Sequence, residues 1–235
     1  MMETEFKNNE PRTSFDWMIY ADATFAGLSV LIPIPLVDLL FETIFKRRMV
    51  QTIAKRNDRQ IPPDIARLVN RSQGCWPGCL MWPITLTLEF LKRLYRTILY
   101  FLTIKAASDQ LSYHWHRAFL IDFMIRRGDL ATLERARLAG IAMDEVLQTT
   151  TTSPLMQLAT QISNGFRHVS RTTWNFLRRN QEDKVLINAR EEMEASWNDF
   201  SGYLIQLAKK YEANFAQLDR EFLQEDIDIK VSDEL

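Results

Sequence analysis

The sequence predicts an all-α protein in which Pro-broken apolar helical hairpins are followed by a helical bundle with a long amphipathic C-terminal helix. Only 7 glycines and 8 prolines occur in 235 residues, which is few for a turn-rich all-β protein. Apolar residues recur every three or four positions over much of the chain, the spacing of a helix with one buried face. Two apolar stretches, at about 17–45 and 74–104, each contain two prolines, which interrupt a helix because proline lacks an amide donor.

The N-terminal elements follow from this pattern. Residues 1–14 are polar and acidic, lack the basic-then-apolar order of a secretory signal, and are predicted to form a disordered tail. A first helix is expected over about 16–31. Pro33 and Pro35 favour locally extended backbone, so the chain is expected to break there and to form a second helix over about 36–57.

The middle of the chain contains the second apolar stretch and a clear helix boundary. The pair Pro62-Pro63 predicts a turn followed by a short helix. After the second apolar stretch, apolar residues at helical spacing predict a helix that continues to residue 127. Gly128 suits the left-handed position that ends a helix, and Asp129 suits the N-cap of a helix over about 130–148.

The C-terminal part is predicted to be a second amphipathic unit. The run at 149–154 is an expected linker, because β-branched threonines and proline disfavour a helix. An amphipathic helical hairpin is expected over 155–225 and an acidic tail over 226–235. The last helix carries an apolar stripe whose members are three or four positions apart: Met193, Trp197, Phe200, Leu204, Leu207, Tyr211, Phe215, Leu218 and Phe222.

Charge divides the chain into two halves. Residues 1–128 contain 17 Lys and Arg against 12 Asp and Glu, whereas residues 129–235 contain 12 against 18. The overall net charge of −1 gives no reason to expect a nucleic-acid partner. A basic, apolar half and an acidic half are typical of one part that faces a membrane and another that faces solvent.

The apolar stretches are the main functional signal. Only 15 uncharged residues separate Asp22 from Asp38, whereas a transmembrane helix needs about 20 apolar residues. We therefore expect a monotopic membrane anchor or scaffold on the cytoplasmic face; the alternative is a soluble all-helical interaction scaffold with both stretches in its core. The expected membrane-inserted turns contain Pro33, Pro35, Pro77 and Pro83. The expected interfacial anchors are tryptophans and flanking cations: Trp17, Trp76, Trp82, Lys46, Arg47, Arg48, Lys92, Arg93 and Arg96.

A further basic segment, at 163–180, is amphipathic. Its cations and its tryptophan form a candidate lipid or partner surface: Arg167, Arg171, Trp174, Arg178 and Arg179. Such a helix suits lipids of the anionic inner leaflet or an acidic partner. It equally suits pairing with the acidic C-terminal helix, which is itself a candidate site for a protein partner.

A local motif extends over residues 21–56. Ile32-Pro33-Ile34-Pro35 is followed by Asp38 and then by the run Met49-Val50-Gln51-Thr52-Ile53-Ala54. This pattern is similar to the apolar helical segment of the YcjF-like membrane proteins, a helical, membrane-associated family of unknown function. The resemblance implies membrane association. Because that family is often linked to small GTPases, it also implies a GTPase partner.

Carboxylates beside the first apolar stretch are the strongest catalytic candidates. Asp22, Asp38 and Glu42 suggest, as a second alternative, a membrane enzyme or transport accessory. The other interpretation is that they form ordinary ion pairs with nearby cations: Glu42 with Lys46, and Asp22 with Arg47 or Arg48. Because no nucleotide-binding, zinc-protease or nucleophile motif occurs, no catalytic residue, metal or cofactor is expected.

The histidines and cysteines give weaker signals. His114 and His116 are two positions apart, so on a helix they point in different directions and cannot share a metal. Surface or interface packing is expected for both. Cys75 and Cys79 lie at the second apolar stretch and are expected to be small packing residues, with palmitoylation as the alternative.

Overall fold

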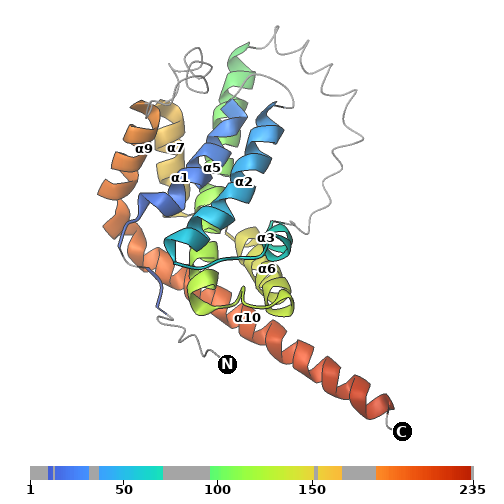
Figure 1. The fold of residues 1–235 in the computed structure, drawn as a ribbon. Coiled ribbons are helices and arrows are strands. Elements are labelled where there is room, and N and C mark those ends of the chain that lie inside the picture. The colour runs from blue at the N-terminus through green and yellow to red at the C-terminus, as the bar shows by residue number, and fades with distance from the viewer. Residues whose placement is uncertain are drawn as a thin grey trace.

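The structure, a computed structural model, describes residues 10–12, 14–31, 37–70, 96–150, 153–165 and 184–233. Within these ranges the chain is helical and contains no strand, which confirms the predicted all-α class. In chain order (Figure 1) the elements are α1 (Trp17–Leu28), the 3-10 turn η1 (Ser29–Leu31), α2 (Val37–Arg56), α3 (Pro63–Val69), α5 (Arg96–Arg127), α6 (Leu133–Gln148), α7 (Pro154–Gly165), α9 (Lys184–Ala195) and α10 (Trp197–Asp233).

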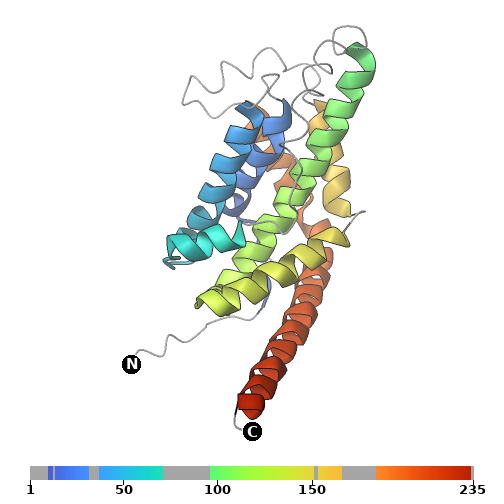
Figure 2. The same ribbon diagram turned by 90° about the vertical axis from the view of Figure 1, so that its right-hand side faces the viewer.

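The 32-residue helix α5 forms the axis of the molecule. Helices α1, α2 and α7 pack along it, and α1 and α2 run antiparallel to each other (Figures 1 and 2). Helix α6 follows the C-terminal end of α5 and contacts α3 and α10. The second half of α10 extends away from the other helices, as Figure 2 shows.

Helix α1 belongs to the hydrophobic core. Ile19, Ala23 and Ala26 are buried. Gly27 permits a close approach to α5, because a Cβ at this position would lie 2.5 Å from the Cα of Leu111. The α1 part of the first apolar stretch is therefore covered by other helices of the same chain.

The helix boundaries predicted for the first part of the chain agree with the structure. The helix expected over about 16–31 corresponds to α1 with η1, and the helix expected over about 36–57 corresponds to α2. The turn at Pro62-Pro63 leads into α3 as predicted. The expected break at Pro33 and Pro35 lies outside the described residues.

The corner between α5 and α6 was predicted only in part. Gly128 ends α5 with a φ of 79°, as expected, and the amide of Asp129 donates to the carbonyl of Met124 at 3.0 Å. The N-cap prediction was wrong, because the side chain of Thr132 accepts the hydrogen bond from the amide of Arg135. Asp129 is instead buried and binds other side chains.

The apolar stripe of the C-terminal part is buried from Met193 to Phe215. The sequence predicted that this stripe belongs to one continuous helix. That prediction was wrong, because a turn at Ser196 separates α9 from α10. Helix α6 ends at Gln148 and helix α7 begins at Pro154, on either side of the expected linker. Helices from both sides of that linker contribute to one hydrophobic core.

Candidate functional site

Asp22 is buried on α1 and is neutralised by α2. Arg48 Nε lies 2.8 Å from Asp22 Oδ1, and the hydroxyl of Thr52 donates to Oδ2 at 2.7 Å. The predicted ion pair between Asp22 and one of two arginines is thus confirmed for Arg48. These two contacts join α1 to α2. Removing Arg48 would leave the buried charge of Asp22 without a compensating cation, which is strongly destabilising.

Glu42 is the second candidate carboxylate, and it also lies in an ion pair. Lys46 Nζ is 2.5 Å from Glu42 Oε1, as the i,i+4 spacing predicted. His114 Nε2, on α5, lies 3.7 Å from the same oxygen. Burial acts to raise the pKa of Glu42, but His114 and Lys46 outweigh it and lower this pKa to about 2. Burial also lowers the pKa of His114 to about 4, so this histidine is neutral at pH 7.

His116 points to a different set of partners. Its Nδ1 lies 2.6 Å from the carbonyl of Ser112, and its Nε2 lies 2.7 Å from the hydroxyl of Tyr203 on α10. A carbonyl only accepts, so Nδ1 carries the proton and Tyr203 donates to Nε2. Burial lowers the pKa of His116 to about 4. Surface or interface packing was predicted for His114 and His116; both side chains are buried between α5 and the helices around it, so neither lies at the surface.

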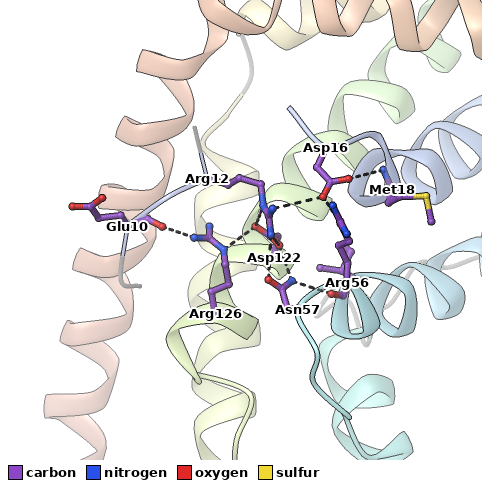
Figure 3. A network of polar contacts seen from close by, with 9 residues as sticks. Glu10, Arg12, Asp16, Met18, Arg56, Asn57, Asp122 and Arg126 are labelled. Atoms are coloured by element: carbon purple, nitrogen blue, oxygen red, sulfur yellow. Dashed lines mark hydrogen bonds and ion pairs between the residues drawn. The ribbon is translucent and has the colours of Figure 1, made fainter. Parts of the chain in front are cut away.

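A buried carboxylate on α5, Asp122, organises the network in Figure 3. Arg12 Nε lies 3.4 Å and Arg126 Nε 3.0 Å from Asp122 Oδ2, and Asn57 donates to Oδ1 at 2.8 Å. Arg126 also donates to the carbonyl of Glu10. Glu10 and Arg12 fall in the predicted disordered tail, and here both take part in contacts with α5.

The same network holds the start of α1. Asp16 caps the helix by accepting from the amide of Met18 at 3.2 Å, and Arg56 Nε lies 2.5 Å from the Asp16 carboxylate (Figure 3). The ring of Phe15 is stacked with that of Tyr20. It also packs against Trp197 of α10, and the ring centroids of Phe15 and Trp197 are 5.3 Å apart. The segment before α1 is thus bound to α2, α5 and α10.

Asp129 holds the middle of α10. Its carboxylate accepts from Arg127 Nε at 2.9 Å, from Arg135 at 2.9 Å and from the Tyr211 hydroxyl at 3.0 Å. Arg127 also pairs with Glu212 on α10. Burial and the Asp129 charge raise the pKa of Tyr211. These contacts join the α5–α6 corner to α10, so the helix leaves the bundle in a fixed direction.

The solvent side of α2 combines exposed apolar and basic residues. We define the α2 outer face by the exposed side chains that share this side of the helix: Leu40, Thr43, Ile44, Arg47, Arg48 and Lys55. Leu40 is 59% and Ile44 46% exposed, and both lie in the first turns of the helix. The cations follow toward the C-terminal end. Beneath this face, Phe45 stacks on Phe25 of α1 with ring centroids 4.9 Å apart.

The structure describes some of the predicted site residues. Trp17 is partly buried against the core, Lys46 pairs with Glu42, and Arg47 is exposed. The side chains of Asp38 and Arg96 are not among those described. The other predicted positions lie outside the described residues: Pro33, Pro35, Pro77, Pro83, Trp76, Trp82, Lys92, Arg93, Arg167, Arg171, Trp174, Arg178, Arg179, Cys75 and Cys79.

Three buried charges were not anticipated from the sequence. Asp122 and Asp129 are described above, and Arg117 donates to the carbonyl of Val69 at 2.5 Å and to the side chain of Asn70 at 3.1 Å. Arg117 thereby caps the last turn of α3. Arg117 and Asp122 sit among apolar residues of α5, and a charge within such a run is a signal of burial, although the sequence does not show which partner neutralises it.

The described residues contain neither a membrane-spanning helix nor a metal site. No helix there is long and apolar enough to cross a membrane, and no group of three or more potential ligands is placed to hold a metal ion. Comparison with protein-family models finds no match to the chain. Comparisons with curated proteins and with solved structures find none either.

Proposed function

We propose that the chain is a membrane-associated helical scaffold that attaches through the α2 outer face to an anionic membrane surface on the cytoplasmic side. The observation that carries this proposal is the order of residues along α2. Leu40 and Ile44 come first, in the opening turns of the helix, and Arg47 follows one turn later. This order suits insertion of the helix start below the headgroups, with Arg47 at the level of the phosphates.

The distances support a shallow contact. A helix rises 1.5 Å per residue, so Arg47 lies about 10 Å along the axis from Leu40. Interfacial helices bury their apolar side by about 5–10 Å. Leu40 is 59% and Ile44 46% exposed, so lipid contact contributes about 1 kcal/mol for each, and a juxtamembrane cation such as Arg47 contributes about 1 kcal/mol. The described face alone therefore supports weak, reversible attachment.

The arrangement of helix ends extends the proposal. The ends of η1, α7 and the starts of α2, α5 and α9 lie at one end of the bundle (Figures 1 and 2). The predicted turn with Pro33 and Pro35, the second apolar stretch at 74–104 and the basic segment at 163–180 all connect to helices there. We include these three segments in the proposed membrane contact, as the sequence predicts.

The burial of α1 supports the alternative of a soluble interaction scaffold. Its apolar residues pack on α5 of the same chain, so this part of the first stretch needs no lipid to cover it. The two proposals therefore differ in what the exposed start of α2 contacts: lipid in the first and solvent in the second. A lipid-binding measurement separates them directly.

Vesicle flotation of the full chain tests the proposal. We expect binding to phosphatidylcholine vesicles that contain phosphatidylserine and weaker binding without it or at high salt. The double variant Leu40→Glu, Ile44→Glu is expected to bind about thirtyfold more weakly, because it removes about 2 kcal/mol of apolar contact. Leu133→Glu is the matched control, since Leu133 is 58% exposed on α6. Equal flotation of both variants, or none by the wild type, contradicts the proposal.

A further inference from the structure

None of the described helices covers the end of α10 where it leaves the bundle. Helix α10 is buried at Tyr211 and Phe215 and partly buried at Leu218. Every described side chain from 220 to 224 is exposed, with Phe222 at 41% and Leu223 at 55%. The helix nevertheless continues to Asp233, which adds about 20 Å beyond residue 220 (Figures 1 and 2). We call residues 219–233 the α10 arm.

The negative charge of this arm destabilises the helix that the arm forms. Residues 219–235 contain seven Asp and Glu against two Lys and Arg. Acidic residues near a helix C-terminus interact unfavourably with the partial negative charge of the last carbonyls. Isolated helices of fewer than about 12–15 residues are marginal in water. The arm therefore combines exposed apolar residues with a charge excess that a cationic neighbour would relieve.

We propose that the α10 arm is a docking site for a basic amphipathic helix of a partner protein. The partner's apolar side would cover Phe222 and Leu223, and its Lys and Arg residues would face Asp219, which lies between those two residues around the helix. Helix-on-helix contacts of this kind bury a few apolar anchors and use flanking charges to set orientation. This proposal does not rest on membrane attachment, because the arm lies at the opposite end of the molecule from the start of α2 (Figure 1).

Charge also argues against a second copy of the chain as the occupant. Two arms side by side would bring together two helices that each carry a net charge of −5 over residues 219–235. Like charges across a helix pair are destabilising, and correct partners are selected by opposite charges at these positions. The fixed base of the arm, held by Asp129, lowers the entropy lost when a partner binds.

A peptide-binding experiment with the full chain tests this proposal. The probe is a synthetic amphipathic helix with leucines on one side and lysines on the other. The control is a scrambled peptide of the same composition. We expect the amphipathic peptide to bind at least about tenfold more tightly than the scrambled one and to protect the amides of 220–233 from hydrogen exchange.

Two variants separate the apolar and the charge contributions. Phe222→Ser with Leu223→Ser retains the arm's charge, and Asp219→Lys reverses one charge while leaving both apolar residues; each is expected to weaken binding about tenfold or more. Leu133→Ser on α6 is expected to bind as the wild type does. Equal binding of the scrambled peptide, unchanged binding by both arm variants, or self-association of the chain that depends on Phe222 overturns the proposal.

Discussion

Replacing Gly27 by alanine tests directly whether α1 packs inside the protein. A Cβ at Gly27 would meet three atoms of Leu111, at 2.5 Å from Cα, 2.8 Å from N and 3.0 Å from Cβ. Two of these atoms are backbone, so no side-chain rotation relieves the clash. Gly202 on α10 is the matched control, because a Cβ there has no neighbour within 4 Å.

The expected effects of the two substitutions have opposite signs. Carbon atoms pack at about 3.5–4.0 Å, so Gly27→Ala requires α1 and α5 to separate by about 1 Å, which forfeits part of their dispersion contacts. Overpacking of this kind costs about 1–3 kcal/mol, and the backbone contact favours the upper value. Alanine regains about 1 kcal/mol of helix propensity. The net loss at Gly27 is about 2 kcal/mol, whereas Gly202→Ala is expected to gain about 1 kcal/mol.

Urea unfolding of both variants measures these free energies. We expect the unfolding midpoint to fall for Gly27→Ala and to rise for Gly202→Ala, with unchanged denaturant dependence of the free energy. If Gly27→Ala is neutral or stabilising, α1 does not approach α5 as described. The first apolar stretch would then be free to contact lipid along its whole length, and the proposed attachment would have to include α1.

Three further predictions concern the buried polar groups. Asp122→Asn is expected to lower stability by about 1–2 kcal/mol and to speed tryptic cleavage at Arg12, because it removes a buried charge whose cationic partners are partly exposed. Tyr211→Phe is expected to lower the unfolding free energy by about 1–2 kcal/mol, since it leaves Asp129 one donor short. Acidification from about pH 7 to pH 4 is expected to destabilise the fold: His114 and His116 have depressed pKa values, so the unfolded chain binds more protons in this range. The pH dependence of urea midpoints, compared with that of His116→Asn, measures this effect.

Local elements of the fold were predictable because local chemistry determines them. Pro62-Pro63 marks the start of α3, and Gly128 supplies the left-handed residue that ends α5. The spacing of the C-terminal stripe identified the side of α10 that is buried as far as Phe215. Each of these signals lies within a few residues of the feature that it predicts.

The partners of the buried charges were not predictable because they are distant in the chain. Asp122 pairs with Arg12 across 110 positions, and Asp129 binds Tyr211 across 82. Helical periodicity assigns such residues to a solvent-facing side, since only apolar residues define the buried side. This assumption fails for α5, because other helices pack around it and leave it little solvent-facing side. The exposure of the α2 outer face likewise depends on which side of α2 the helices α1 and α5 cover.

The distance between the two proposed contact surfaces decides how they act together. Helix α5 alone is about 48 Å long, and the α10 arm extends beyond its C-terminal end (Figure 2). Screening limits electrostatic forces to about 8–10 Å at physiological salt, so an anionic membrane at the α2 end neither repels nor orients the acidic arm. Orientation therefore has to come from the α2 contact, and the Asp129 cluster transmits it to the arm through a rigid corner. Tyr211→Phe removes one contact of that corner, the hydrogen bond to Asp129. The substitution is expected to leave vesicle binding unchanged, because the α2 outer face does not depend on α10.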